Sequence, residues 1–405
     1  MCEREIYMAD ENKRDEIHLQ KIRASIERTK KFKLHAKQVL KLTGIAILLL
    51  FAIVFFQNRS DLTWNGFKNW VSDKIALAGI GQGYPVTITG GYSKAIDTFG
   101  DAIIELTDTS FVVLDSTGKT AASRQHGFAS PAISSTDRYA LLYDTNGTNF
   151  RIESVSRTVY SASADGQILS ASLSKSGCYA LITKDSSYLG AVYVYDKKHN
   201  PLLEWKSAFH QLQSVSVSPN GKHTAITGIT TENGQIKSCV MVFNYISKED
   251  TKTFEFYDSM LLDCEFVTSD YLSVVGDTAS YVIDIRNGKY VQIDYDGSSL
   301  AGFDFDQNYG TVLLLSKFDD LHNCDILFAD EAGKIISRTH TNLKGGFIKL
   351  KGKNAYTVSN NRLYRYHNNG KLKNEIEVGS NIKQCAVLGN SAYLLGTSKI
   401  KKISL

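Results

Sequence analysis

The segment SASLSKSGCYALI, residues 170–182, decides the fold of this 405-residue chain. Small and apolar residues alternate up to Leu173, a polar turn with Gly177 follows, and a second apolar run begins at Tyr179. Alternation with a period of two is typical of a β-strand, and a short glycine-containing connection between two such runs indicates an antiparallel hairpin. The segment therefore predicts two neighbouring strands joined by a tight turn.

Related segments recur along the chain at a spacing of about forty residues. They read SPAISSTDRYALL, SVSVSPNGKHTAI, DCEFVTSDYLSVV, GFDFDQNYGTVLL, FIKLKGKNAYTV and QCAVLGNSAYLL, with a weaker first copy, KAIDTFGDAIIEL. Most copies continue with a third strand and a glycine turn, which makes four strands per unit, the composition of a propeller blade. The residues that precede the second strand in the eight copies are Ala102, Tyr139, Tyr179, His223, Tyr271, Tyr309, Ala355 and Ala392.

The copies predict an all-β protein, a β-propeller of eight blades, with seven as the alternative if the weak first copy is incomplete. No helical pattern of ten residues lies between the strands, which excludes βαβ units. The last copy, residues 382–405, has room for only three strands. Residues 84–91, YPVTITGG, read as a lone strand, and we expect it to close the ring by pairing with the last blade. The propeller domain therefore covers residues 84–405.

An uncharged apolar run, LTGIAILLLFAIVFF at residues 42–56, precedes the repeats. Because a bilayer core offers no water to backbone amides, such a run spans it as a helix, and a span needs roughly 17 to 25 residues. Residues 42–58 reach that length if the side chain of Lys41 extends to the headgroups. The sequence therefore predicts one transmembrane helix. Its anchoring side chains are those of Ile45, Leu48, Leu49, Phe51, Val54 and Phe55.

The tail before this run, residues 1–41, sets the orientation. From Lys21 to Lys41 it has eight Lys or Arg and one acidic residue, Glu27. Positive residues stay cytoplasmic, so we expect the tail in the cytoplasm and the propeller outside the cell membrane. A cleaved signal peptide is the competing interpretation, but the charged region is too long for one, and the small-residue site at 76–78 lies too far downstream.

Residues 59–83 join the span to the repeats. Their apolar positions recur at three- and four-residue intervals, which predicts a helix. Trp64 and Trp70, with Lys41 on the other side of the run, suit the membrane–water interface. The alternative is a helix packed against the base of the propeller. The glycines of GIGQGY, residues 79–84, mimic a phosphate loop, but no strand precedes them and no helix follows, so we interpret them as a flexible neck.

The charge balance argues against one class of partner. The chain after Phe56 has 35 basic and 35 acidic residues, so the formal net charge of +4 belongs to the tail. A nucleic-acid-binding domain carries excess positive charge, and this domain has none, so we expect no nucleic acid. We expect the basic tail beside membrane lipid. Its charges follow from the orientation rule alone, or alternatively they bind anionic lipid, at about 1 kcal/mol for each charge near the surface.

Candidate metal and disulfide sites are weak. The donors around residues 319–325 (Asp319, Asp320, His322, Cys324 and Asp325) match no metal signature. Asp294 to Gly297, followed by Asp304 and Asp306, resembles a calcium loop but lacks its glutamate, so we expect blade-joining turns, no metal and no cofactor. Five cysteines without C-x-x-C spacing predict free buried thiols, with one disulfide as the alternative. They are Cys178, Cys239, Cys264, Cys324 and Cys385.

The whole arrangement of basic tail, one span, short neck, GQGYPVTITGG and propeller repeats resembles an uncharacterised family of Gram-positive, clostridial-type membrane proteins, the domain-of-unknown-function family 5711. The most specific element is Gly83-Tyr84-Pro85 with the VTITG strand after it. The repeats are also similar to WD40-like and quinoprotein-like propellers, although the Trp-Asp dipeptide of the former and the tryptophan docking motif of the latter are missing. The family has no assigned activity, so the resemblance implies no site residues.

These observations favour a non-enzymatic propeller at the outer membrane face that binds a cell-envelope protein or a wall polymer. The alternative is an extracytoplasmic glycan hydrolase or lyase, with carboxylates such as Asp97, Asp263 or Asp304 near the inner strands and in the central funnel. A third hypothesis is a sensor whose tail signals inward.

Overall fold

The computed structural model of the protein describes residues 38, 39, 41–46, 48, 49, 64–245, 251–257, 259–317 and 322–405. The chain divides into two compact units, residues 1–68 and residues 69–405. In the first unit the described residues between 38 and 49 are helical. There Thr43 Oγ1 donates a hydrogen bond of 2.6 Å to the carbonyl oxygen of Val39, one turn earlier.

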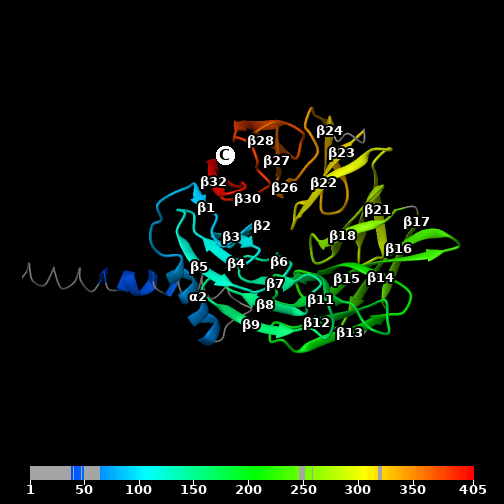
Figure 1. Cartoon of the computed structure of the whole chain (residues 1–405), viewed down its shortest axis with the longest axis horizontal. Coiled ribbons are helices and arrows are strands. Elements are labelled where there is room, and N and C mark those ends of the chain that lie inside the picture. Colours follow the sequence, from blue (N-terminus) through cyan, green and yellow to red (C-terminus); the bar gives the residue numbers. More distant parts are fainter. Residues whose placement is uncertain are drawn as a thin grey trace, which may run out of the picture. The chain divides into compact units, whose positions relative to one another are not determined.

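Eight four-stranded antiparallel sheets make up the second unit and are arranged as the blades of a propeller (Figure 1). Blade 1 contains β2 (Ser93–Phe99), β3 (Ala102–Thr107), β4 (Ser110–Leu114) and β5 (Thr120–Gln125), and blade 2 contains β6 (Pro131–Ser135), β7 (Ala140–Asp144), β8 (Asn149–Glu153) and β9 (Thr158–Ser163). Blade 3 contains β10 (Ile168–Leu173), β11 (Tyr179–Thr183), β12 (Gly190–Tyr195) and β13 (Pro201–Ser207), and blade 4 contains β14 (Gln211–Val217), β15 (His223–Glu232), β16 (Gln235–Asn244) and β17 (Lys252–Tyr257).

The remaining blades follow the same order, from the innermost strand to the outermost. Blade 5 contains β18 (Leu261–Phe266), β19 (Tyr271–Gly276), β20 (Ala279–Asp284) and β21 (Lys289–Asp294), and blade 6 contains β22 (Ser299–Asp306), β23 (Gly310–Ser316), β24 (Cys324–Ala329) and β25 (Ile335–His340). Blade 7 contains β26 (Ile348–Lys351), β27 (Asn354–Ser359), β28 (Arg362–His367) and β29 (Leu372–Glu377), and blade 8 contains β30 (Gln384–Leu388), β31 (Ser391–Leu395), β32 (Lys399–Ser404) and β1 (Val86–Thr87).

The prediction of an all-β propeller with eight blades is confirmed. The weak first copy of the repeat forms a complete four-stranded blade, which excludes the seven-blade alternative. The second strands begin within one residue of the positions aligned from the sequence, as at Ala102, Tyr179 and Tyr271. The repeat could be recognised from the sequence because a turn interrupts the alternation of apolar and polar residues at the same place in each unit.

The outermost strand of blade 8 comes from the beginning of the domain. Val86 and Thr87 of β1 pair with Ile400 and Lys399 of β32, and the Ile88 amide donates to the carbonyl oxygen of Ser398 at 3.0 Å. Blade 8 therefore needs both ends of residues 84–405, and the ring closes without leaving β32 as a free edge.

The hydrophobic core is divided into eight clusters, and each lies between two neighbouring blades. The cluster between blades 8 and 1, for example, joins Ile103 and Leu114 to Tyr393 and Ile400, all at most 1% exposed. One blade cannot cover both of its faces, so burial of these side chains requires a neighbour on each side. Closure of the ring supplies that neighbour to the first and last blades.

The two ends of the ring carry different connections, and we name them accordingly. Rim 1 carries the turns that join the first strand of each blade to the second and the third strand to the fourth. Rim 2 carries the turns between second and third strands and the connections to the next blade. This assignment follows from the antiparallel pairing within every blade.

Most of the predicted membrane segment lies outside the described residues, including the anchoring positions Phe51, Val54 and Phe55. Ile45, Leu48 and Leu49 are helical and more than half exposed. Within the ranges given above, none of the helices combines the length and the apolar composition that crossing a bilayer requires.

Candidate functional site

An axial cavity of about 180 Å³ opens at rim 1, where the innermost strands end. Acidic, basic and neutral polar side chains line this cavity. The lining residues come from blades 1, 2, 5, 6, 7 and 8, and Lys175 adds one more from a turn of blade 3. The charged residues of the lining are Asp97, Asp137, Lys175, Glu265, Asp306, Lys349 and Lys351.

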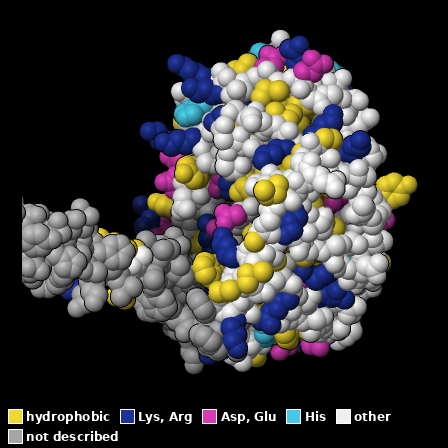
Figure 2. Space-filling view, turned by 90° about the vertical axis from the view of Figure 1, so that its left-hand side faces the viewer, with side chains coloured by type: hydrophobic (Ala, Val, Ile, Leu, Met, Phe, Trp, Pro, Cys, Tyr) yellow, Lys and Arg dark blue, Asp and Glu magenta, His cyan; other side chains and the backbone are white. Residues whose placement is uncertain are grey.

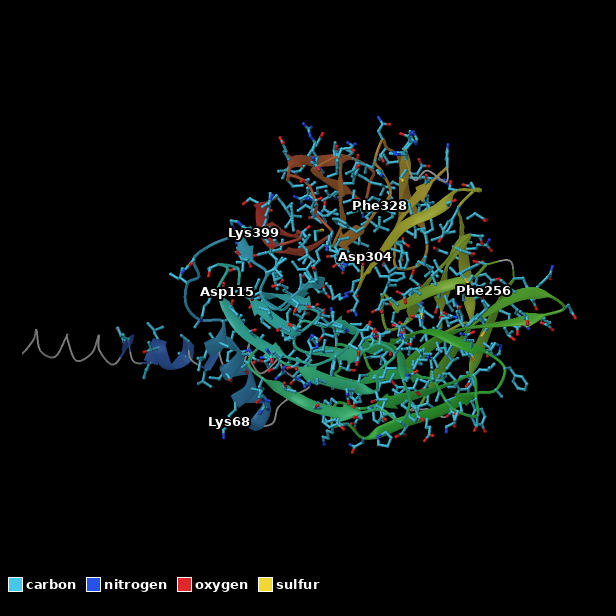
Figure 3. The ribbon with its side chains drawn as sticks, in the orientation of Figure 1. Lys68, Asp115, Phe256, Asp304, Phe328 and Lys399 are labelled. Carbon is cyan, nitrogen blue, oxygen red and sulfur yellow. The ribbon has the colours of Figure 1, made fainter. Side chains whose placement is uncertain are left out.

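An ion pair joins blades 6 and 7 beside this cavity. Lys349 Nζ lies 3.3 Å from Asp304 Oδ2, and that oxygen also accepts a hydrogen bond of 2.6 Å from the Leu350 amide. Cavity water still reaches the pair, because 20% of the Asp304 side chain and 32% of the Lys349 side chain are exposed. Figure 3 shows Asp304 near the centre of the ring.

Each partner changes the proton affinity of the other. The negative charge of Asp304, supported by that of Asp97, raises the pKa of Lys349 above its ordinary value. Burial raises the pKa of Asp304, and the positive charge of Lys349 opposes that effect. The pair is therefore held by attraction across a partly wet site, where an ion pair is stronger than at an exposed surface.

A second pair of acidic residues lies on β18 of blade 5. Asp263 and Glu265 are two positions apart, so both side chains leave the same face of the strand. Ser214 Oγ donates to Asp263 Oδ1, and Ser216 Oγ donates to Glu265 Oε2 at 3.1 Å. Burial raises the pKa of Asp263, and burial together with the charge of Asp263 raises the pKa of Glu265 to about 7.

Asp263 also influences a residue on the other side of the ring. Burial raises the pKa of Tyr143, on β7 of blade 2, to about 12, and the negative charge of Asp263 adds to this effect. The charge of Asp263 therefore acts beyond its own blade.

The three carboxylates singled out in the sequence all lie on innermost strands. Asp97 accepts hydrogen bonds from Ser135 Oγ of blade 2 and from the amide of Thr98. The negative charges of Asp97 and Asp304 both act on Lys349, whereas Asp263 accepts a hydrogen bond from Ser214 of blade 4.

Sequence reasoning missed Glu265 and Lys349, and it noted Asp306 only as part of a calcium-like pattern. A signal for Glu265 was present, since it lies two residues from Asp263, on the same strand face. Lys349 has no such signal, because its partner Asp304 comes from another blade.

Many polar groups near the axis join neighbouring blades. Backbone amides of one innermost strand donate to a side-chain oxygen of the preceding blade, as Leu173 does to Ser134, Val217 to Ser172 and Phe266 to Ser216, at 3.0 to 3.2 Å. Unpaired buried polar groups are costly, so these bonds favour one blade spacing. The axial carboxylates serve this bracing function as well as lining a cavity.

A separate cavity of about 680 Å³ lies on rim 2 between blades 5 and 6. Its lining includes Leu262, Asp277, Asp294 and Asp296. Asp296 is paired with Arg338 Nη1 at 2.5 Å, but Asp277 and Asp294 form no ion pair within the described part of the chain. The cavity therefore carries two uncompensated negative charges.

Apolar side chains border these charges. Met260 and Leu262 are 39% and 40% exposed, and the Met260 amide donates to Asp277 Oδ1 at 2.8 Å. Ile236, 47% exposed, lies on the projecting β15–β16 hairpin and on the same face as Ser238. Ser238 Oγ accepts a hydrogen bond from the amide of Leu261, which places this face of the hairpin beside blade 5. We call Ile236, Met260, Leu262, Asp277 and Asp294 the rim 2 groove.

Helix α2 (Trp64–Ala76) rests on rim 1 through its last two turns. Asp73 Oδ1 accepts hydrogen bonds from the Ser156 amide at 2.8 Å and from the hydroxyl groups of Ser154 and Ser156, in the β8–β9 turn. Ala76 and Leu77 pack against the core between blades 1 and 2. Trp64 begins α2, and Trp70 is half-buried on it.

The glycine-rich neck after α2 is held against blade 1. Gly81 donates its amide proton to Thr117 Oγ1 at 2.7 Å, and Gly83 donates to the Thr117 carbonyl oxygen at 3.0 Å. A Cβ atom on Gly81 would lie 2.3 Å from the Lys119 amide nitrogen, so only glycine allows this close approach. The glycines thus pack against the β4–β5 turn.

The weak metal and disulfide candidates are dispersed. Asp319 and Asp320 lie outside the described residues, while Asp325 pairs with Arg338 and His340. Asp304 and Asp306 lie on β22, away from the turn at Asp296. No group of three possible metal ligands occurs in the described ranges. The five cysteines of the propeller form no disulfide with one another, and all are buried except the half-buried Cys178.

Comparison with solved structures supports the fold. The crystal structure of BamB from Moraxella catarrhalis aligns with a TM-score of 0.51 and 10% identity over 80% of this chain and 100% of that chain. The structure of the dihydro-heme d1 dehydrogenase NirN in complex with DHE aligns with a TM-score of 0.53 and 12% identity over 78% of this chain and 73% of that chain. Identities this low show a common fold alone.

Sequence comparison gives one assignment. No curated protein matches the chain. Residues 84–405, the whole propeller, match DUF5711, described as a family of unknown function. The chain therefore belongs to the DUF5711 family.

Proposed function

We propose that the protein is a single-pass membrane protein of a Gram-positive cell envelope. In this proposal the apolar run at residues 42–56 is the anchor, the basic tail lies in the cytoplasm and the propeller lies outside. The propeller acts as a non-enzymatic binding or scaffold module. Support comes from the uncharged run and from the excess of Lys and Arg on its amino-terminal side.

The docking site in this proposal is the rim 2 groove, and its occupant is a segment of an envelope protein. The observation that carries it is an exposed apolar side chain beside uncompensated carboxylates: Leu262, 40% exposed, lines the same cavity as Asp277 and Asp294. Exposed apolar surface next to charge of one sign is typical of a protein interface. The complementary segment carries apolar side chains followed by Lys or Arg.

Photocrosslinking in whole cells tests this proposal. A photoreactive amino acid in place of Leu262 is expected to capture one envelope protein through a peptide with apolar and basic residues. The same amino acid in place of Leu202, 38% exposed on the outer strand of blade 3, is the matched control. Asp277→Asn with Asp294→Asn is expected to reduce capture about tenfold. Equal capture from both positions, or a captured peptide without basic residues, would contradict the proposal.

The second candidate function, a glycan hydrolase or lyase, is favoured by one observation. Glu265 lines the axial cavity with a pKa of about 7, close to the value that suits a general acid. Asp263 on the same strand is the second carboxyl group. The test is whether the protein releases reducing ends from purified wall polysaccharide. If it does, and if Glu265→Gln abolishes the release while the control Glu377→Gln keeps it, the protein is an enzyme of this kind and not a binding module.

A further inference from the structure

The charge of the propeller is unevenly distributed. From Lys344 to the carboxyl terminus, which covers blades 7 and 8, the chain has twelve Lys or Arg and only two acidic residues. Residues 57–343 have 23 basic and 33 acidic residues. The neutral total therefore conceals a strongly basic sector. Figure 2 shows Lys and Arg side chains spread over the face that it draws, so the excess is evident from the sequence count.

Four exposed lysines of this sector form a row across rim 1 of blade 7. Lys351 ends β26 at the axial cavity, and Lys353 occupies the next turn. The Asn368 amide donates to the Lys353 carbonyl oxygen at 2.7 Å, which brings the turn before Lys371 and Lys373 alongside. None of the four lysines forms an ion pair with a described residue. We call them the lysine row; it runs from the axis to the outer strand.

Exposed apolar side chains occur on the same rim. Ile75 at the end of α2 is 67% exposed, and Ile80 in the neck is 89% exposed. Ile75 follows Lys74, which extends to Asp101 in the β2–β3 turn of rim 1. Lys119 Nζ donates to the last carbonyl oxygen of α2 at 3.2 Å, which places a second lysine between the helix and the neck. Large exposed apolar residues next to lysines are typical of a surface that lies in the interface of a membrane.

We propose that rim 1 lies against a lipid surface, with Ile75 and Ile80 among the headgroups and the lysine row bound to headgroup phosphates. The inference rests on the membrane anchoring proposed above. It also explains why the opposite rim carries the groove, because rim 2 then faces away from the membrane and is open to a partner. A flat, anionic surface suits lysines that lie side by side on protruding turns of one rim.

Hydrogen exchange of the full chain in lipid nanodiscs tests the inference. In nanodiscs that contain phosphatidylglycerol, the turns at residues 351–354 and 367–373 are expected to exchange at least about tenfold more slowly than in pure phosphatidylcholine. The rim 2 turn at residues 232–235 is expected to exchange equally in both. Equal exchange at rim 1, or protection of rim 2 instead, would overturn the inference.

Matched variants assign the effect to its residues. Replacement of the lysine row (Lys351, Lys353, Lys371 and Lys373) by Gln is expected to abolish the difference between the two lipids. The control replaces four exposed rim 2 lysines, Lys94, Lys344, Lys383 and Lys399, and is expected to keep it. Ile75→Ser with Ile80→Ser is expected to speed exchange of α2 in both lipids, whereas Ile236→Ser, at the β15–β16 turn on rim 2, is not. An unchanged lysine-row variant would overturn the inference.

Two further outcomes separate this inference from its alternatives. A chain that stays outside nanodiscs of both compositions would overturn the anchoring and this inference with it. In the other outcome, the chain inserts into nanodiscs, but the turns of the lysine row exchange more slowly only when soluble long-chain polyphosphate is added, and not with phosphatidylglycerol. That result would overturn the lipid contact and leave the anchoring intact.

Discussion

Val86 on β1 pairs with Ile400 on β32, so the two ends of the propeller domain share one sheet. Ile400 is fully buried and contacts the core between blades 8 and 1, together with Ile103 and Tyr393. The pairing therefore joins blade closure to inter-blade packing, and damage at this point is expected to affect the whole ring.

Ile400→Ala is expected to lower the free energy of unfolding by about 2–5 kcal/mol, because it leaves a cavity in this closed core. Lys399→Ala, at the neighbouring exposed position that pairs with Thr87, is expected to change it by less than about 0.5 kcal/mol. Urea denaturation followed by far-UV circular dichroism measures both. Similar losses for the two variants would show that the closing pair contributes through backbone bonds alone.

Glu105 gives the propeller a pH dependence. Its side chain is 1% exposed in the core beside blade 8, and burial raises its pKa from 4.5 to about 7. The folded protein therefore keeps a proton that the unfolded chain has already released. Stability is expected to fall as the pH rises from about 4.5 to about 7, by up to about 3 kcal/mol, and to stay lower above that range.

Glu105→Gln removes this effect. The variant is expected to be more stable than the wild type at about pH 8, with a smaller difference near pH 5. Because Glu265 titrates in the same range, the difference between variant and wild type is the quantity to measure, by denaturant unfolding at each pH. Glu377→Gln, at an exposed position, is the control. A wild type whose stability rises over this range relative to Glu105→Gln would refute the assignment.

Asp73 is expected to hold α2 on rim 1. Asp73→Ala removes the acceptor for the Ser156 amide and for two hydroxyl groups, which costs roughly 1–3 kcal/mol of local stability. Amides of α2 are then expected to exchange at least about fivefold faster, with the blades unchanged. Lys74→Ala breaks only an exposed ion pair with Asp101 and is expected to have little effect. Equal exchange in both variants would mean that apolar packing at Leu77 holds the helix.

The sequence predicted the architecture because the information is local. Each blade repeats a strand, a turn and a strand within a few residues, as around Gly177, and the alternation shows the faces that must be buried. The approximate position of the innermost strands, and with it the axial location of Asp97, Asp263 and Asp304, followed from the same repeat.

The contacts between blades could not be predicted in the same way. Lys349 meets Asp304 from a strand more than forty residues away, and nothing in either segment specifies that the two face each other. The rim 2 groove depends on how far the β15–β16 hairpin projects beyond its neighbours. The uneven distribution of charge is present in the sequence. A net charge calculated over the whole domain concealed it, because the basic excess from Lys344 onward cancels the acidic excess before it.

Lys349→Met tests whether the axial ion pair stabilises the ring. Removing the ammonium group leaves the half-buried Asp304 with only the Leu350 amide as a donor, so its carboxylate becomes harder to ionise. The loss is expected to be about 2 kcal/mol, less than the 3–5 kcal/mol of a fully buried pair, because cavity water reaches both groups. Lys351→Met, at the exposed neighbour on the same strand, is expected to cost less than about 0.5 kcal/mol.

The double variant with Asp304→Asn separates attraction from packing. If the pair acts by charge, Asp304→Asn with Lys349→Met is expected to be more stable than the sum of the single losses implies, by about 1 kcal/mol or more. Additive losses would mean that Lys349 contributes through its hydrocarbon chain instead. The side-chain carbonyl oxygen that Asp304→Asn introduces can still accept the bond from the Leu350 amide, so the brace between blades 6 and 7 survives in the double variant. The cycle therefore reports the charge interaction itself.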